Sequence, residues 1–392
     1  MPSLPEIVTL VVDGQALQGW QTVAVTRAAE AAAIHFSLAA SNPAWSAQAK
    51  LLRRGRLLEI YTSPDAGQGM GSFSGGDLLC TGHVDEYEVE SAVGTHEVGI
   101  SGRSKAGDAI DCPPVRHKTG LVENKDLKDV ATEFDEWKIG FQADVALPKL
   151  PEVQLVPGQS MFQVLEREAR HLGVLLTGQP DGSVKITRAG SNRHAGALVH
   201  GEPPCGRWKL NISIRNKRSA VHVRGQRSSG TDRESLRQEE VARDGSVGRH
   251  RPYILFNEGD HTSKELKRRG QWERLRRSGS GISIALRVST WRDDGGQLWQ
   301  PGHLVPVVWD EEEIDQDLAV KSVTYNQAVT DGEGGGTWAD LTLVDPRTLG
   351  GKAAGSGSGS GAGGGGGSES EDFAGGLGDD ADFGGGNTSE SE

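Results

Sequence analysis

The sequence predicts a mainly β protein in which two antiparallel β domains flank a small α+β domain, with a low-complexity tail at the end. Segments of alternating polar and apolar side chains recur before residue 101 and again after residue 207, as expected of strands in antiparallel sheets. Between them, apolar residues repeat with helical spacing. A chain of 392 residues is long enough for two or three domains, each with its own core.

The first β domain is predicted to span residues 1–102. Its first strand, 7–12, is rich in β-branched residues and ends at Asp13 and Gly14, a strong signal for a hairpin turn. Further strands are expected at 20–26, 35–40, 57–61, 78–89 and 96–100. Short strands at this spacing favour an antiparallel barrel or sandwich.

A change of architecture is expected at residues 101–112, where the last strand of this domain stops. Gly102 and Gly107 are expected to permit backbone turns that a Cβ atom would resist. We interpret this segment as a hinge and not as an active site.

The α+β domain is predicted to span residues 103–204, with one helix at 126–134 and a second one beginning after Ser160. Ser160 and Gln163 have the spacing of a capping box, and Gly173 is expected to end this helix. Residues 174–177 and 184–187 read as a hairpin. The apolar stripes of the two helices are Leu127, Val130, Ala131 and Phe134, and Phe162, Leu165, Ala169 and Leu172.

The second β domain is predicted to span residues 205–349. Its strands are expected at 208–214, 219–225, 282–288, 304–309, 318–325 and 338–344. A polar insertion at about 226–281 interrupts them and contains a basic helical stretch at 263–277.

The tail, residues 350–392, contains 17 glycines and cannot build a core. Its eight acidic residues and one lysine carry −7 of the formal −12 charge, so the rest of the chain is only mildly acidic. We expect the tail to run along neighbouring chains, with Phe373, Leu377 and Phe383 as apolar anchors.

Composition argues against a membrane or secreted protein. No apolar run approaches the 18 or so residues of a membrane span, and the first residues lack the features of a signal peptide, so synthesis and first folding in the cytosol are expected. Cys80, Cys112 and Cys205 lie far apart and form no CxxC pair. We expect reduced thiols; a late intermolecular disulfide is the alternative.

Three segments partly resemble known catalytic or ligand-binding motifs. We assign none of them a catalytic or ligand-binding role. The acidic run at 310–317 lacks the spacing of an EF-hand and is expected to be a solvated hairpin loop rather than a cation site. Residues 67–72 lack the Lys-Ser/Thr of a P-loop and are expected to form a flexible hairpin loop. His194 and His200 lie in a glycine-broken loop outside any HExxH pattern. The sequence therefore predicts no catalytic, cofactor-binding or metal-binding residues and no cofactor.

The basic stretch has two interpretations. Its bases are expected to pair with acidic neighbours or to lie at a subunit contact; a phosphate-binding face for nucleic acid is the alternative. The seven bases are Lys264, Lys267, Arg268, Arg269, Arg274, Arg276 and Arg277. Trp291, Trp299 and Trp309, in or beside strands, are expected to pack in the core, with an exposed subunit interface as the alternative.

Four blocks of sequence, at 19–27, 101–112, 157–167 with 173–177, and 296–302, together resemble the baseplate hub protein of Mu-like contractile-tailed phages, the gene P product family, which is related to the hubs of T-even phages. The resemblance covers nearly all of residues 5–349. It implies a structural protein of the virion tail baseplate, not an enzyme, with two tube-like β-barrel domains flanking the α+β domain.

The resemblance also implies partners. Three chains would form a ring of pseudo-sixfold symmetry between the hexameric tail tube, or its initiator proteins, and the trimeric central spike, in contact with other baseplate proteins. DNA would pass through the lumen without specific binding, so we expect a net acidic or neutral lining and a peripheral basic stretch. A cell-wall hydrolase at the tail tip and a nucleic-acid-binding module at residues 264–277 remain alternatives.

Overall fold

The computed structural model describes residues 6–41, 51–52, 55–64, 75–92, 95–190, 192–226, 237–260, 262–329 and 335–350, all within one compact unit of the chain. The loop expected at residues 67–72 and the tail from residue 351 onward lie outside these ranges. The interpretations of that loop and of the tail's anchors therefore stay predictions.

Seven strands of the described residues make up the first β region, and they follow the predicted order. Asp13 and Gly14, with φ of 49° and 76°, form the predicted hairpin turn between its first two strands. The strands are β1 (Glu6–Val12), β2 (Gln15–Leu17), β3 (Thr22–Ala28), β4 (His35–Ser41), β5 (Leu57–Pro64), β6 (Asp77–Ala92) and β7 (Thr95–Ser104).

The architecture changes after β7, as predicted, but the two glycines there do not make turns. Gly102 lies within β7, where a Cβ would stand 2.1 Å from the His83 carbonyl oxygen and 2.6 Å from the ring of Phe36. Gly107 lies inside helix α1 (Ala106–Asp111), where a Cβ would stand 3.1 Å from the Arg103 side chain. The prediction of turns was wrong because these glycines serve close approach of neighbouring chain segments instead.

The α+β region follows, and its two main helices begin and end where the sequence predicts. The capping box of Ser160 and Gln163 is present, and Gly173 ends the helix in the left-handed conformation with φ of 65°. The predicted hairpin forms, and β9 adds a parallel strand to it. The elements are β8 (Leu121–Lys125), α2 (Leu127–Phe134), β9 (Phe141–Ala143), β10 (Leu150–Gln154), α3 (Met161–Leu172), β11 (Leu175–Gly178) and β12 (Val184–Thr187).

The second β region returns to antiparallel strands and joins the first. Its strand β20 pairs with β3 from Ser322 opposite Ala28 to Ala328 opposite Thr22, so 13 strands of the described residues share one sheet. Its elements are β13 (Leu198–Val199), β14 (Cys205–Ile212), β18 (Ile282–Val288), β19 (Leu304–Trp309), η3 (Asp310–Glu312), β20 (Ile314–Ala328), β21 (Gly336–Val344) and η4 (Pro346–Leu349).

A smaller sheet covered by a helix interrupts the second β region. It contains β15 (Ala220–Gln226), β16 (Arg237–Arg243) and β17 (Pro252–Asp260), and one face is covered by α5 (Ser263–Gly279). The basic helix was predicted, whereas β16 and β17 were not: charged residues hide the alternation in β16, and β17 begins with four apolar residues in succession, at 253–256. No helix of the described residues is long and apolar enough to cross a membrane.

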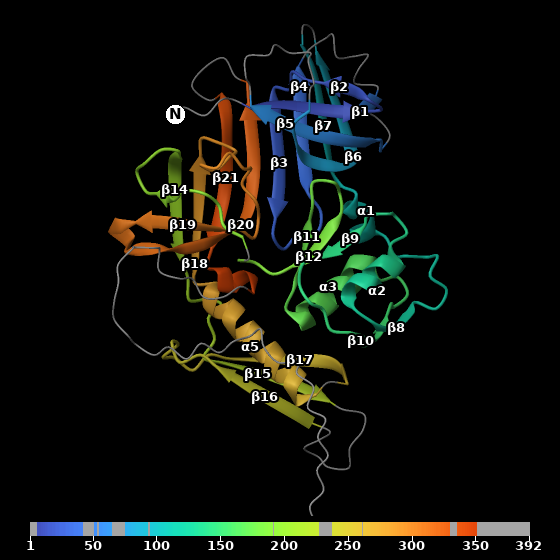
Figure 1. Ribbon diagram of the computed structural model, residues 1–392, viewed down its shortest axis with the longest axis vertical. Helices are drawn as coiled ribbons and strands as arrows, with labels where there is room; N and C mark the ends of the chain where they lie inside the picture. The colour runs from blue at the N-terminus through green and yellow to red at the C-terminus, as the bar shows by residue number, and fades with distance from the viewer. Residues whose placement is uncertain are drawn as a thin grey trace, which may run out of the picture. The chain divides into compact units, whose positions relative to one another are not determined.

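The two β regions share one sheet (Figure 1), and they also share one hydrophobic core. Leu10 and Ile60 of the first region belong to the same cluster of buried residues as Trp291 and Leu341 of the second. The α+β region has a separate core around its helices. The chain thus places two strand-rich regions side by side, and α5 with its small sheet extends from them (Figure 1).

Candidate functional site

Helix α5 is anchored at its start and buried along one side. The Thr262 hydroxyl accepts a hydrogen bond from the Glu265 amide at 3.3 Å, and the Glu265 carboxylate accepts one from the Thr262 amide at 2.8 Å. Leu266 is fully buried against the small sheet. Trp272 is 8% exposed, and its indole packs closely against Gly173 and Gly350. A Cβ atom added to either glycine would stand 2.8 Å from the indole.

The arginines of α5 make contacts with other parts of the chain. Arg276 forms an ion pair with Glu30, on the turn after β3, at 2.5 Å. Arg269 donates a hydrogen bond to the carbonyl oxygen of Arg170, the residue near the end of α3. Within α5 itself, Arg277 pairs with Glu273, one turn earlier, at 2.7 Å. Helix α5 is therefore tied to the first β region and to the α+β region through charge-assisted hydrogen bonds.

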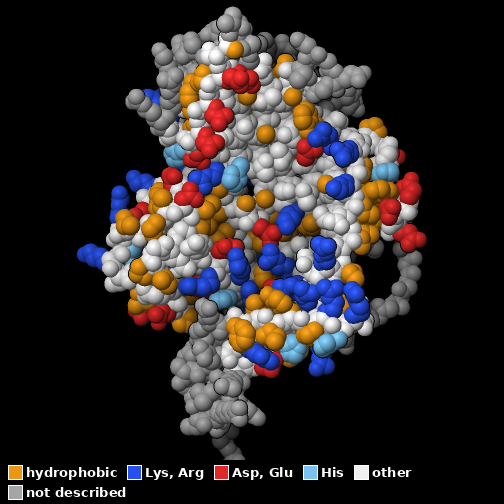
Figure 2. Space-filling view, turned by 180° about the vertical axis from the view of Figure 1, so that it is seen from behind, with side chains coloured by type: hydrophobic (Ala, Val, Ile, Leu, Met, Phe, Trp, Pro, Cys, Tyr) orange, Lys and Arg blue, Asp and Glu red, His pale blue; other side chains and the backbone are white. Residues whose placement is uncertain are grey.

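The surface around these contacts is basic. Figure 2 shows a band of Lys and Arg side chains across the lower half of one face. On α5 itself, only Lys264 and Lys267 of the seven bases are exposed, whereas the five arginines are buried or half-buried. The predicted pairing of basic residues with acidic neighbours is confirmed for Arg276 and Arg277. Because three guanidinium groups are used inside the chain, the helix does not present its bases as one free phosphate-binding face.

A buried histidine–aspartate pair lies in the second β region. His194 Nδ1 is 2.9 Å from Asp293 Oδ2, and the Gln300 amide donates to His194 Nε2 at 3.0 Å, so Nδ1 carries the proton of a neutral ring. Asp293 also accepts hydrogen bonds from the backbone amides of Ala195 and Gln297. Although burial opposes it, these hydrogen bonds lower the pKa of Asp293. The pair holds two loops together.

No sequence pattern predicted the pairing of His194 with Asp293, because the two residues are 99 positions apart. Among the described residues, no group of three or more His, Cys, Asp or Glu side chains could hold a metal ion. The constellation that a cell-wall hydrolase needs was not found in the sequence, and the buried pair alone does not supply it.

Residues 310–313 of the acidic run form the turn between β19 and β20, as predicted, whereas residues 314–317 lie in β20 and not in a loop. Glu313 takes the left-handed conformation at this turn, and the side chain of Glu311 is 72% exposed. One member differs from the prediction: Asp317 is buried and pairs with Arg193 at 2.5 Å. The run is therefore a solvated turn at 310–313 that continues into β20, with one structural ion pair.

The three tryptophans are mainly structural. Trp291 and Trp299 are 1% and 2% exposed, which confirms the predicted core packing. Trp309 is half-buried and stacks on His200, with ring centroids 4.3 Å apart and an interplanar angle of 8°. His200 is thus placed by an aromatic contact rather than in a metal site.

The three cysteines are free thiols, as expected. Burial raises the pKa of Cys80 to about 12 and that of Cys205 to about 11, which makes both poor nucleophiles at neutral pH. Cys112 is exposed. An intermolecular disulfide, if one forms, is best placed at Cys112.

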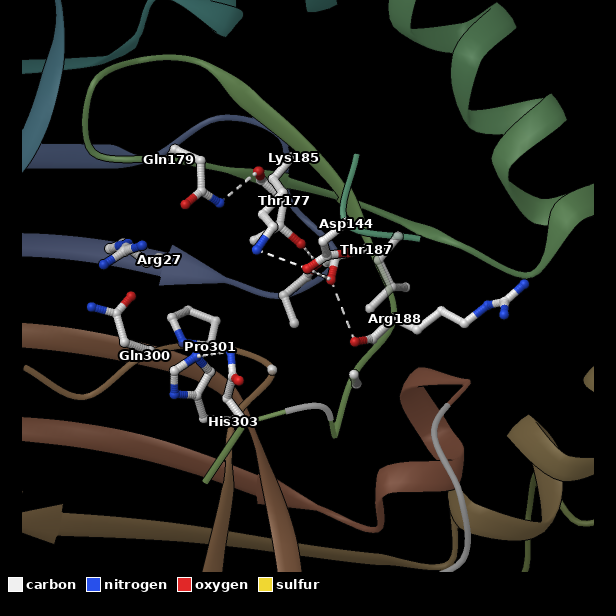
Figure 3. A pocket seen from close by; sticks show the side chains of 15 residues that line it. Arg27, Asp144, Thr177, Gln179, Lys185, Thr187, Arg188, Gln300, Pro301 and His303 are labelled. Atoms are coloured by element: carbon white, nitrogen blue, oxygen red, sulfur yellow. Dashed lines mark hydrogen bonds and ion pairs between the residues drawn. The ribbon is translucent and has the colours of Figure 1, made fainter. Parts of the chain in front are cut away.

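A hollow of about 70 Å³ lies where the first β region, the α+β region and the loop before β19 meet (Figure 3). Its polar side chains include Arg27 from β3, Lys185 from β12 and His303. Lys185 pairs with Asp144 at 2.7 Å. Sequence reasoning missed Arg27, although its place two residues after Val25 in an alternating strand predicts an inward side chain.

Comparisons with known proteins agree with this architecture. Three family models match the chain in order: Mu phage baseplate assembly protein GpP-like, N-terminal, over residues 7–104; baseplate hub protein gp44-like, second domain, over 106–188; and Mu phage baseplate assembly protein GpP, fourth domain, over 262–350. Baseplate hub protein gp44 of Escherichia phage Mu is 27% identical over 333 residues, which are 81% of this chain and 83% of that protein.

Solved structures show the same fold. The 43 kDa tail protein of prophage MuSo2 from Shewanella oneidensis has a TM-score of 0.73 and 25% identity, over 88% of this chain and 99% of that one. The E. coli c3393 protein, a type VI secretion component with structural similarity to the T4 bacteriophage tail proteins gp27 and gp5, has a TM-score of 0.53 and 10% identity, over 88% of this chain and 78% of that one. The chain belongs to the Mu phage baseplate hub family, the gp44/GpP family, whose members are structural and non-enzymatic components of the phage tail baseplate.

Proposed function

We propose that three copies of this chain form a closed ring that joins the hexameric tail tube, or its initiator proteins, to the trimeric central spike. In this proposal each chain supplies two tube-like β-barrel domains, at residues 1–102 and 205–349, so three chains offer six similar units to the tube. The α+β domain, 103–204, lies at the periphery. DNA crosses the lumen without specific binding.

The pairing of β3 with β20 carries this proposal. It places two antiparallel, strand-rich regions side by side in one sheet, although they are separated by nearly the whole chain. The pairing of β3 with β20 is rigid, because Val25, Val323 and Tyr325 are fully buried beneath it. The hydroxyls of Thr26 and Thr324 also lie 3.0 Å apart across the two strands. A fixed pair of similar units per subunit is what a threefold ring needs to match a sixfold one.

The contacts of α5 support a lumen that is not basic. Arg269, Arg276 and Arg277 are held by groups of the same chain, so they do not need DNA phosphates as partners. A lumen crowded with free Lys and Arg would retain DNA and slow its ejection. We therefore place the basic helix at the periphery or at a subunit contact.

Copy number tests the proposal. Quantitative mass spectrometry of purified tails should give half as many copies of this chain as of the subunit in one tube ring. Equal numbers would refute the pseudo-sixfold arrangement. The spike protein should be present in the same number as this chain, and its absence from particles that contain this chain would argue against the junction role.

A further inference from the structure

The least explained charged group in the described part of the chain is Arg27. Its side chain is 3% exposed and lies on the same face of β3 as the buried Val23 and Val25. Within the described residues, neither Nε nor Nη1 has a hydrogen-bond partner, and no carboxylate lies within ion-pair distance of the guanidinium. A guanidinium is a permanent cation, so among the described residues the charge of Arg27 has no counter-ion.

The charge of Arg27 is not balanced by the other groups around the hollow. Asp144 is the one carboxylate among the lining residues, and it already binds Lys185 at 2.7 Å and the Thr187 hydroxyl at 2.9 Å. Arg188 also borders the hollow, but Figure 3 shows its side chain extending away from Arg27. Among the described residues that line the hollow, the charge of Arg27 therefore has no carboxylate to balance it.

A second buried donor lies beside the same hollow. The Asn192 side-chain amide is 3.4 Å from His303 Nε2, so the proton of the neutral ring belongs on Nδ1, which has no partner among the described residues. Burial, together with the charges of Arg27 and Lys185, lowers the pKa of His303 to about 4, so the ring is neutral at pH 7. The neutral ring of His303 and the guanidinium of Arg27 thus both border the hollow.

We propose that this hollow binds a small oxyanion of the phosphate or carboxylate class, held by the guanidinium of Arg27 with His303 as a second donor. The N–H groups of a guanidinium bind such anions through charge-assisted hydrogen bonds, and neither Nε nor Nη1 of Arg27 has a hydrogen-bond partner among the described residues. The volume of about 70 Å³ suits an inorganic anion and is too small for a nucleotide. Because three parts of the chain border the hollow, the anion would also brace their junction.

Binding is tested on the full chain with inorganic phosphate and, separately, acetate, each against chloride at equal ionic strength. We expect calorimetry to show one anion per chain and the Tm to rise with phosphate or acetate but not with chloride. Arg27→Met should remain folded and lose at least about tenfold in affinity, the scale of one charge-assisted contact. Arg287→Met, which removes an exposed arginine paired with Asp340 at 2.8 Å, should bind as the wild type does.

A wild-type measurement keeps the proposal testable if Arg27→Met does not fold. Crystals of the wild-type protein soaked in arsenate, a phosphate analogue, should show anomalous density beside Arg27 and His303. Wild-type protein that responds to neither phosphate nor acetate beyond chloride would overturn the proposal. So would arsenate density found only elsewhere, or an Arg27→Met variant that keeps full affinity.

Discussion

Replacing Trp272 by alanine is expected to destabilise the protein strongly, because the indole joins α5 to two other parts of the chain. It packs against Gly173 at the end of α3 and Gly350 after η4, and the guanidinium groups of Arg269 and Arg276 lie 4.9 and 5.3 Å from its ring centroid. The arginines and glycines keep their positions only while the ring fills the space between them.

The size of the effect follows from burial. A tryptophan buries roughly 150–250 Å², and at about 25 cal/mol per Å² this corresponds to roughly 4–6 kcal/mol. Measured Trp→Ala changes in cores cost about 3–5 kcal/mol, and each cation–π contact adds about 0.5–1 kcal/mol at a partly exposed site. We therefore expect Trp272→Ala to lower the free energy of unfolding by about 4 kcal/mol.

Urea unfolding followed by circular dichroism measures this change, with Trp338→Ala as the matched control. Trp338 is also a tryptophan under an arginine, with Arg287 5.0 Å from its ring centroid, but it is only half-buried. Its replacement should cost about 1–2 kcal/mol, since less apolar area is returned to water. A Trp272→Ala variant as stable as Trp338→Ala would refute the packing of α5 described above.

Three further perturbations test other contacts. Gly173→Ala should cost about 1–2 kcal/mol more than Gly158→Ala, because both positions have positive φ but only the first would place a Cβ against an indole; urea unfolding compares the two, and equal losses would contradict the clash. Arg276→Glu should lower the Tm by several degrees, because it sets a second carboxylate against Glu30, the present partner of Arg276. The control Lys267→Glu, at an exposed position, should leave the Tm unchanged. Equal Tm values for the two variants would contradict a stabilising role of the ion pair. The pKa of His303 is lowered to about 4 from its ordinary 6.5, so the neutral ring is favoured in the folded state. The contribution of His303 to the free energy of unfolding is therefore complete above pH 6.5 and declines as the pH falls toward 4. The variant His303→Asn should lose less stability over that interval than the wild type. Identical stability–pH profiles for the two proteins would contradict the lowered pKa.

Local signals in the sequence predicted local structure well. The dipeptide at Asp13 and Gly14 formed its hairpin, and the Ser160–Gln163 capping box began its helix, because both features act over a few neighbouring residues. The alternation of 20–26 likewise predicted β3. These features need no knowledge of the rest of the chain.

Contacts between distant residues could not be predicted in the same way. Alternation marks β3 and β20 as strands but does not say that Thr26 will face Thr324, 298 positions away. Gly102 was interpreted as a turn because composition alone cannot distinguish a turn from a close approach of strands. For Arg27, alternation pointed inward, yet the lack of a counter-charge appears only once three regions are brought together.

The most direct test of the proposed hub is electron cryomicroscopy of the baseplate in intact tails, refined without imposed symmetry. We expect a ring of three copies at the junction of tube and spike, with residues 6–104 and the strands after residue 281 alternating around the lumen and α5 away from it. A ring of six copies, a single copy per particle, or a lumen lined by the arginines of α5 would contradict the account.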